Sequence, residues 1–274
     1  KKRIYNYKMW LDTTDPGISR TLILFGKREI DHKIMLEQAL KPGMTVLDIG
    51  ANIGYYAMME SQLVSPNGKV IAIEPSPKNI ELLKRNVKLN KRDNIITVKA
   101  GAVSNTSENR EFYLASASNL NTFHQSGSAA QYLTGETVEV ATYTVDEIQD
   151  EFGKIDLIRM DVEGHEVEIF SGMLPGILSG ELSPMIIFET HNSQYNDEHD
   201  MRTPLMAMFD AGYRVTLLSS NAEKGTKKIN AMGYKPYDIV KTDFVKRALY
   251  RDISNVHALD LICESGARTV LLAR

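Results

Sequence analysis

Cysteine is nearly absent from this sequence, since Cys263 is the only one among 274 residues. One cysteine excludes an intrachain disulfide and a cysteine-rich zinc site. Disulfides mark oxidising compartments, so a chain with a single thiol is typical of a reducing one. No signal peptide pattern precedes the first expected element. We therefore expect a cytoplasmic protein.

The sequence also lacks a large excess of either charge. It has 32 Lys and Arg and 35 Asp and Glu, and the formal net charge is −3. Proteins that mainly neutralise phosphates carry a basic excess, so we expect no nucleic-acid partner. Long apolar runs are missing as well. Runs such as residues 21–25 and 185–188 are far too short to span a membrane.

What the sequence does contain, from residue 45 onward, is an alternation of short apolar runs with helical patterns. We expect strands at 45–49, 69–74, 94–98, 155–160, 185–189, 213–218 and 268–272. Helices are expected at about 53–64, 80–89, 165–171 and 204–211. This order predicts an α/β fold, a doubly wound, mostly parallel seven-stranded Rossmann-like sheet with helices on both faces. We divide the chain into an N-terminal cap over residues 1–40, with a short hairpin and a helix, and one domain over 41–274.

Two stretches interrupt the alternation. Residues 111–114 and 137–142 resemble an inserted edge hairpin, and the segment 115–135 between them contains no Asp, Glu, Lys or Arg. A loop this long in a compact domain is either functional or disordered. Its amide side chains could close over a polyol acceptor, and a plain solvated loop is the alternative. Residues 219–265 have weak periodicity and support no prediction.

A strand-to-helix turn rich in glycine is the strongest local signal. Asp48 ends the strand at 45–49, and Gly50 and Gly54 follow it in the turn. Glycine allows close approach of the backbone to a ligand, and the helix start offers free N–H groups. Glu74 ends the next strand, where a carboxylate can accept hydrogen bonds from a ribose diol.

The turn lacks the G-x-G-x-x-G pattern of dinucleotide sites, and Asp48 would repel a pyrophosphate but suits an ammonium and a sulfonium. D-x-G-x-x-x-G with a second-strand Glu resembles the S-adenosylmethionine site of class I methyltransferases. Two alternatives remain open: an NAD(P)-dependent oxidoreductase, which the missing pattern weakens, and a non-catalytic module that binds a nucleotide or S-adenosylmethionine.

Three segments, residues 41–56, 73–77 and 158–170, together resemble the FkbM family of methyltransferases. The D-V-E-G-H-E block that begins at Asp161 is the most distinctive part, and residues 15–20 and 25–29 resemble the family's approach to the site. The resemblance implies a methyltransferase that uses S-adenosyl-L-methionine. It also implies an acceptor hydroxyl on a sugar, glycan or polyketide.

By position, the resemblance also implies a set of cofactor-binding residues: Glu29, Asp48, Gly50, Ala51, Asn52, Gly54, Glu74, Pro75, Ser76, Ala102, Val103, Ser104 and Asp161. In this assignment the glycine turn lines the methionine and ribose, and Glu74 holds the ribose hydroxyls. Many class I enzymes place an acid after the third strand to face the adenine amine. This sequence has none there, so we expect backbone groups and Ala102, Val103 or Ser104 to contact adenine.

Acidic and imidazole side chains follow the fourth and fifth strands. Asp161 and Glu163 follow one, and Glu189 and His191 end or follow the other. The carboxyl ends of parallel strands meet at one edge of a sheet, so we expect these groups to lie together. A hydroxyl acceptor must lose its proton during methyl transfer. His191, with an ordinary pKa of about 6.5, is the expected base, and Asp161 is a second base or its orienting partner.

These oxygen and nitrogen groups could also bind Mg, Mn or Zn. Because such sets are common in clefts without an ion, we expect no metal. The identity of the acceptor and the oligomeric state are not predictable from these patterns.

Overall fold

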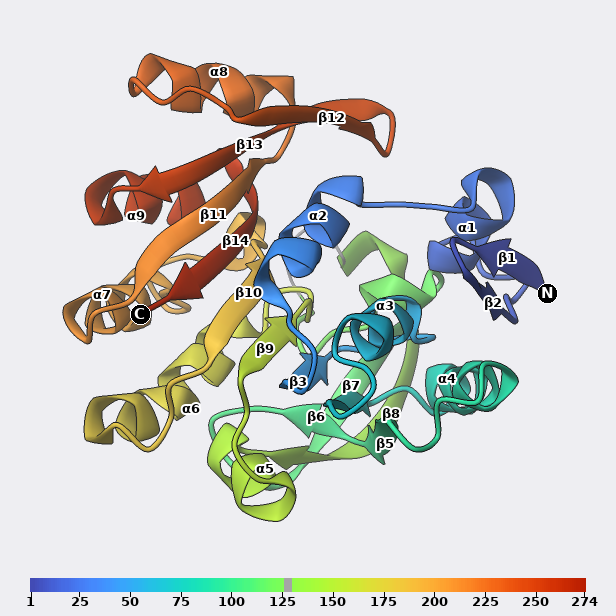
Figure 1. Cartoon of the computed structure of the whole chain (residues 1–274). Coiled ribbons are helices and arrows are strands. Elements are labelled where there is room, and N and C mark those ends of the chain that lie inside the picture. The colour runs from blue at the N-terminus through green and yellow to red at the C-terminus, as the bar shows by residue number, and fades with distance from the viewer. Residues whose placement is uncertain (126–129) are drawn as a thin grey trace.

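The main sheet has nine strands in the computed structural model, which describes residues 1–125 and 130–274 (Figure 1). Their order across the sheet is β12-β13-β11-β14-β10-β9-β3-β4-β5. The bounds are β3 (Thr45–Ile49), β4 (Lys69–Glu74), β5 (Ile96–Ala100), β9 (Leu157–Met160), β10 (Met185–Glu189), β11 (Arg214–Ser220), β12 (Asp238–Thr242), β13 (Val245–Ile253) and β14 (Ala267–Ala273).

Most of these strands point the same way. β10, β9, β3, β4 and β5 pair in parallel, whereas β14 is antiparallel to β10 and β11, and β13 is antiparallel to β11 and β12. All of the described strands of this sheet except β13 and β14 therefore share one direction. The predicted α/β class with a mostly parallel sheet is confirmed. The strand number was underestimated, because β12 and β13 form a further hairpin at the edge.

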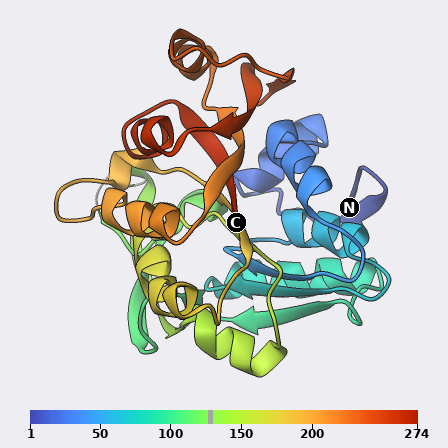
Figure 2. The ribbon, with the colours of Figure 1, turned by 60° about the vertical axis from the view of Figure 1, so that its left-hand side comes forward.

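Helices cover both faces of the sheet (Figure 2). One face packs against α1 (Ile18–Phe25), α2 (Ile30–Ala39), α3 (Tyr55–Leu63) and α4 (Pro77–Leu89). The other packs against α5 (Val145–Phe152), α6 (Glu166–Ser179), α7 (Arg202–Asp210), α8 (Glu223–Ala231) and α9 (Asn255–Cys263). Because side chains alternate along a strand, Val46 of β3 joins the first core while Leu47 and Ile49 join the second.

The N-terminal residues form the predicted hairpin, β1 (Lys2–Ile4) and β2 (Tyr7–Met9), followed by α1 and α2. Ile4, Met9 and Leu22 are buried in the same apolar cluster as Val46 of the main sheet. The cap therefore shares its core with the rest of the chain, and the division at residue 40 stays a prediction.

The expected edge hairpin is present in a small second sheet with the order β6-β8-β7. Its strands are β6 (Ala102–Val103), β7 (Asn109–Ala115) and β8 (Leu133–Tyr143), and short 3-10 turns are η1 (Ser118–Leu120), η2 (Ala130–Tyr132) and η3 (Asn192–Gln194). Residues 126–129 of the expected acceptor loop 115–135 lie outside the described residues. Within the described ranges, no helix has the length and apolar character needed to cross a membrane.

Candidate active site

The turn between β3 and α3 has a backbone shape that needs glycine. Gly50, Asn52 and Gly54 all have left-handed backbone angles, with φ of 77°, 50° and 89°. A Cβ on Gly50 would overlap the carbonyl oxygen of Asp161, because the backbone that follows β9 passes directly beside the turn. A side chain at Gly50 is therefore excluded by both space and conformation.

Glu74 holds this turn against the end of β4. Its Oε2 accepts a hydrogen bond of 2.8 Å from the Asn52 backbone N–H, and its Oε1 accepts bonds from Ser76 N at 3.0 Å and Asn79 Nδ2 at 3.1 Å. Burial raises the pKa of Glu74 to about 7, although these hydrogen bonds oppose the shift. Oε1 thus accepts two hydrogen bonds and Oε2 one, so Oε2 retains lone-pair capacity for a ligand hydroxyl.

A pocket opens beside Glu74 at the carboxyl edge of the sheet. Several expected cofactor residues line it: Gly50, Asn52, Glu74, Pro75, Ala102, Val103 and Asp161. Five others were not singled out from the sequence: Gly101, Phe112, Ser118, Phe123 and His165. Asn119 and Asn121, amides of the expected acceptor loop, also line this pocket. Ser76 and Ser104 are buried and do not line this pocket; Ser104 Oγ instead lies 3.0 Å from His165 Nε2.

A second pocket lies on the other side of the glycine turn. Its lining includes the expected residues Glu29 and Ala51, and Gly50, Asn52 and Asp161 line both pockets. The two pockets therefore adjoin along the turn. Gly54 lines neither of them and instead packs against Leu83.

Asp48 does not occupy the expected position. It is fully buried, lines neither pocket, and its Oδ1 lies 3.2 Å from Arg159 Nη1. The same guanidinium contacts Asp161 Oδ2 at 3.0 Å and donates to the Gly50 carbonyl at 3.3 Å. Direct contact of Asp48 with a bound ammonium does not fit this placement, because the Arg159 charge already compensates the carboxylate. A charged residue inside the apolar run of β9 was the only signal for Arg159.

The acidic and imidazole groups after β9 and β10 do lie together, as their strand ends predicted. His191 Nδ1 is 2.7 Å from Glu166 Oε1. His191 Nε2 is 3.5 Å from Glu189, 3.6 Å from Glu163 and 3.7 Å from Asp161, and it has no hydrogen-bond partner among the described residues. The ring is thus surrounded by carboxylates.

This environment changes the protonation of His191. Burial favours the neutral ring, but the carboxylates of Glu166 and Glu163 outweigh burial and raise the pKa of His191 well above its ordinary value. A ring held in its protonated form cannot accept the proton of an acceptor hydroxyl. This environment argues against His191 as the base, and its role stays a prediction. Glu166, the first residue of α6, lies against His191, a contact that the sequence did not indicate.

Glu163 has the opposite kind of shift. Burial raises the pKa of this carboxyl to about 8; the His191 cation opposes the shift, and Asp161 adds to it. Its backbone is left-handed, with φ of 50°, which is unusual for a residue other than glycine. Glu163 also lines the pocket beside Glu74. A carboxylate with a pKa near the working pH is well suited to general base catalysis.

A wide cleft of about 640 Å³ adjoins the second pocket through Arg28, Glu29 and Asn119. Its charged lining is mainly basic: Lys27, Arg28, Lys241, Arg247 and Arg268, with Glu29 and Asp243 as the acids. Arg268 Nη2 lies 3.2 Å from Glu29, and Arg268 also pairs with Glu189. Arg28 and Arg247 are also ion-paired with nearby acids, so the charge of the cleft that is not compensated in this way comes from Lys27 and Lys241.

Comparison with known proteins places this arrangement in a family. The model of the methyltransferase FkbM domain matches residues 48–215, more than half of the chain. A protein-L-isoaspartate O-methyltransferase of Methanopyrus kandleri is 36% identical over 61 residues, or 22% of this chain and 27% of that protein. The hexuronic acid methyltransferase AglP of Haloferax volcanii is 27% identical over 165 residues, or 58% of this chain and 60% of AglP.

The chain thus matches about a quarter of the isoaspartate relative and less than two thirds of AglP. Among solved structures, the methyltransferase FkbM from Methylobacillus flagellatus has a TM-score of 0.40 and 15% identity, and covers 85% of this chain and 59% of its own. The family match covers the glycine turn, Glu74 and the acidic block after β9. The chain therefore belongs to the FkbM methyltransferase family.

Proposed function

We propose that this protein transfers a methyl group to a hydroxyl of a sugar-type or glycan acceptor. The observation that carries the proposal is the meeting of the cofactor pocket with a carboxylate of raised pKa, Glu163, beside a basic cleft. The pocket suits the methyl donor, Glu163 suits the removal of a proton from the acceptor, and the cleft suits the binding of the acceptor.

The residues beside Glu74 fit S-adenosylmethionine. Gly50 lines this pocket without a side chain that could obstruct a ligand, and Glu74 Oε2 has a lone pair free for a ribose hydroxyl. Ile73, Val103 and Phe112 give the same pocket an apolar wall suited to adenine. We propose that these groups hold the cofactor.

When bound, the cofactor supplies the methyl group, which passes to the acceptor oxygen as the carbon–sulfur bond breaks and its electron pair stays on sulfur. We propose that Glu163 takes the hydroxyl proton on a carboxylate oxygen. In this scheme His191 and Asp161 are positioning residues for Glu163. His191 Nε2 lies 3.6 Å from Glu163 and 3.7 Å from Asp161. Arg159 in turn fixes Asp161.

The acceptor class follows from the cleft. Among the described lining residues, Lys27 and Lys241 are basic side chains outside the printed ion pairs of the cleft, so an acceptor that carries a carboxylate or another anionic group suits it. AglP, whose name gives hexuronic acid as its substrate, is in agreement with such an acceptor. We also propose a cytoplasmic location, because a single cysteine is typical of a reducing compartment.

The proposal is tested by transfer of a radiolabelled methyl group from S-adenosylmethionine to neutral sugars, uronic acids and their glycans. We expect turnover with hydroxyl acceptors and the strongest turnover with the acidic ones. Tight binding of S-adenosylhomocysteine without transfer to any acceptor would instead indicate a non-catalytic module. Activity that a chelator abolishes and Mg²⁺ restores would assign Asp161, Glu163 and His191 to a cation, since their ligand atoms lie within 4.8 Å of one another.

Substitution of Glu74 tests the cofactor site. We expect Glu74→Gln to weaken binding of S-adenosylhomocysteine about tenfold to a hundredfold, since hydrogen bonds to a charged group contribute roughly 1.5–3 kcal/mol. Isothermal titration calorimetry measures the change. Glu81→Gln, an exposed residue on the neighbouring helix α4, is the control and should keep wild-type affinity. Unchanged affinity in a folded Glu74→Gln variant would place the ribose elsewhere.

A further inference from the structure

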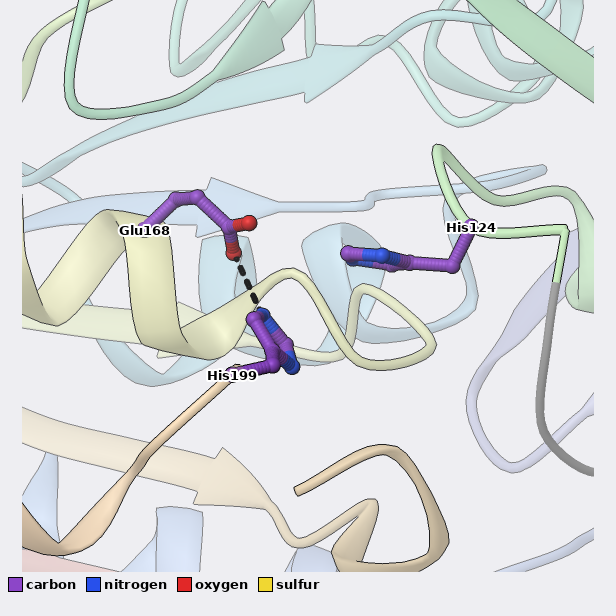
Figure 3. Close-up of side chains that lie close together, drawn as sticks. All are labelled: His124, Glu168 and His199. Atoms are coloured by element: carbon purple, nitrogen blue, oxygen red, sulfur yellow. Dashed lines mark hydrogen bonds and ion pairs between the residues drawn. The ribbon is translucent and has the colours of Figure 1, made fainter. Parts of the chain in front are cut away.

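A separate cluster of metal-ligating side chains lies beside the cofactor pocket. His124 comes from the segment after β7, Glu168 from the first turn of α6, and His199 from the loop before α7 (Figure 3). One ligand atom of each lies within 4.8 Å of the others. Figure 3 shows the three side chains converging from these three segments. None of them belongs to the cluster around His191.

The hydrogen bonds of His199 orient its ring toward Glu168. His199 Nδ1 is 2.8 Å from the carbonyl oxygen of Gln194. A carbonyl only accepts hydrogen bonds, so Nδ1 carries a proton and Nε2 is the nitrogen that faces Glu168, at 3.1 Å. Histidines that bind metals commonly donate their other N–H to a backbone carbonyl in this way.

Two further imidazole nitrogens at this place have no hydrogen-bond partner among the described residues. One is His124 Nε2, and the other is Nδ1 of His165, whose side chain is only 1% exposed. His165 Nδ1 lies 3.3 Å from Glu168 Oε2, and its Nε2 is held by Ser104 Oγ at 3.0 Å. Buried polar atoms are rarely left unpaired, so each calls for an explanation such as an ion.

We propose that His124, Glu168 and His199 bind one divalent transition-metal ion, with zinc as the best-suited species. Two imidazoles and one carboxylate form an established zinc ligand set, and a water or His165 is available as the fourth ligand. A hard cation such as Mg²⁺ prefers oxygen ligands and suits this set poorly.

The position of the site gives the ion a structural consequence. Phe123, next to His124, lines the pocket beside Glu74, and its ring centroid lies 4.6 Å from that of His165. A bound ion would tie the wall that contains Phe123 to the start of α6 and to the loop before α7. Metal binding should therefore raise the thermal stability of the protein.

Zinc titration of the chelator-treated, full chain tests the proposal by calorimetry, with the visible spectrum of Co²⁺ as a second readout of the ligand set. We expect His199→Ala and His124→Ala each to weaken binding at one site by roughly a hundredfold or more, beyond the effect of losing an outer-shell partner. His257→Ala is the matched control, since this histidine lies on α9 and contacts Tyr234. Circular dichroism checks that the variants are folded.

The experiment must also distinguish zinc binding at this site from zinc binding at the cluster around His191. His191→Ala should keep the zinc equivalent that His199→Ala loses. The proposal is overturned if the wild-type chain binds no zinc, if both variants of the proposed ligands retain it, or if only His191→Ala loses it.

Discussion

Glu163→Gln is expected to lower methyl transfer about 10²–10⁴-fold, the usual contribution of a positioned general base. The amide keeps the size of the side chain but cannot take a proton from the acceptor hydroxyl. Binding of S-adenosylhomocysteine should stay close to that of the wild type, because the cofactor contacts we propose are made by the glycine turn and Glu74. Single-turnover rates and calorimetry measure the two effects separately.

The dependence of the rate on pH provides a second readout of the same assignment. The pKa of Glu163 is raised to about 8, so the carboxyl is protonated and inactive as a base below that pH. The wild-type rate should therefore rise through about pH 8 and level off above it, and this rise should be absent in Glu163→Gln. A rise near the ordinary histidine pKa of about 6.5, with full activity in Glu163→Gln, would return the role to His191.

Gly50→Val is expected to abolish measurable binding of the cofactor. The added Cβ would overlap the Asp161 carbonyl oxygen, and the φ of 77° is unfavourable for a β-branched residue. Both effects displace the turn that links Glu74 to the strand ends, and stability should fall by about 1–3 kcal/mol. Calorimetry with S-adenosylhomocysteine and thermal unfolding measure the two losses.

Gly180→Val is the control that distinguishes the effect of backbone strain from the loss of the cofactor site. Gly180 has a similar φ of 84°, but no atom lies within 4 Å of a Cβ built there, and the residue caps α6 away from the pockets. This control should lose stability and keep its affinity. A folded Gly50→Val variant with wild-type affinity would show that the turn does not contact the cofactor.

The parallel half of the sheet was predictable because its strands are buried on both faces and appear as continuous apolar runs. β3, β4 and β10 have the predicted bounds. The hairpin of β12 and β13 was not predictable in the same way. Its turn uses Asp243 and Phe244 with φ of 48° and 66°, where a turn of this kind normally shows Asn-Gly or Asp-Gly.

For the active site, the strand ends predicted which groups would meet, since Asp161, Glu163, Glu189 and His191 follow neighbouring strands. Their protonation was not predictable, because it depends on burial and on the placement of Glu166 against the imidazole. The pairing of Asp48 with Arg159 was missed for a related reason. Two residues from different strands neutralise each other only once β3 and β9 are side by side.

The place of β14 in the sheet has a consequence for the order of assembly. β11 and β10 are not hydrogen-bonded to each other, and β14 lies between them and pairs with both. Within the described sheet, β14 is thus the strand that connects β11, β12 and β13 to the parallel strands. It follows all the other strands of this sheet in the sequence, so the ribosome synthesises it after them. Arg268 of this strand also contacts Glu29 and Glu189. We therefore expect the contact between the basic cleft and the carboxylate cluster that passes through Arg268 to form only after β14 has been synthesised.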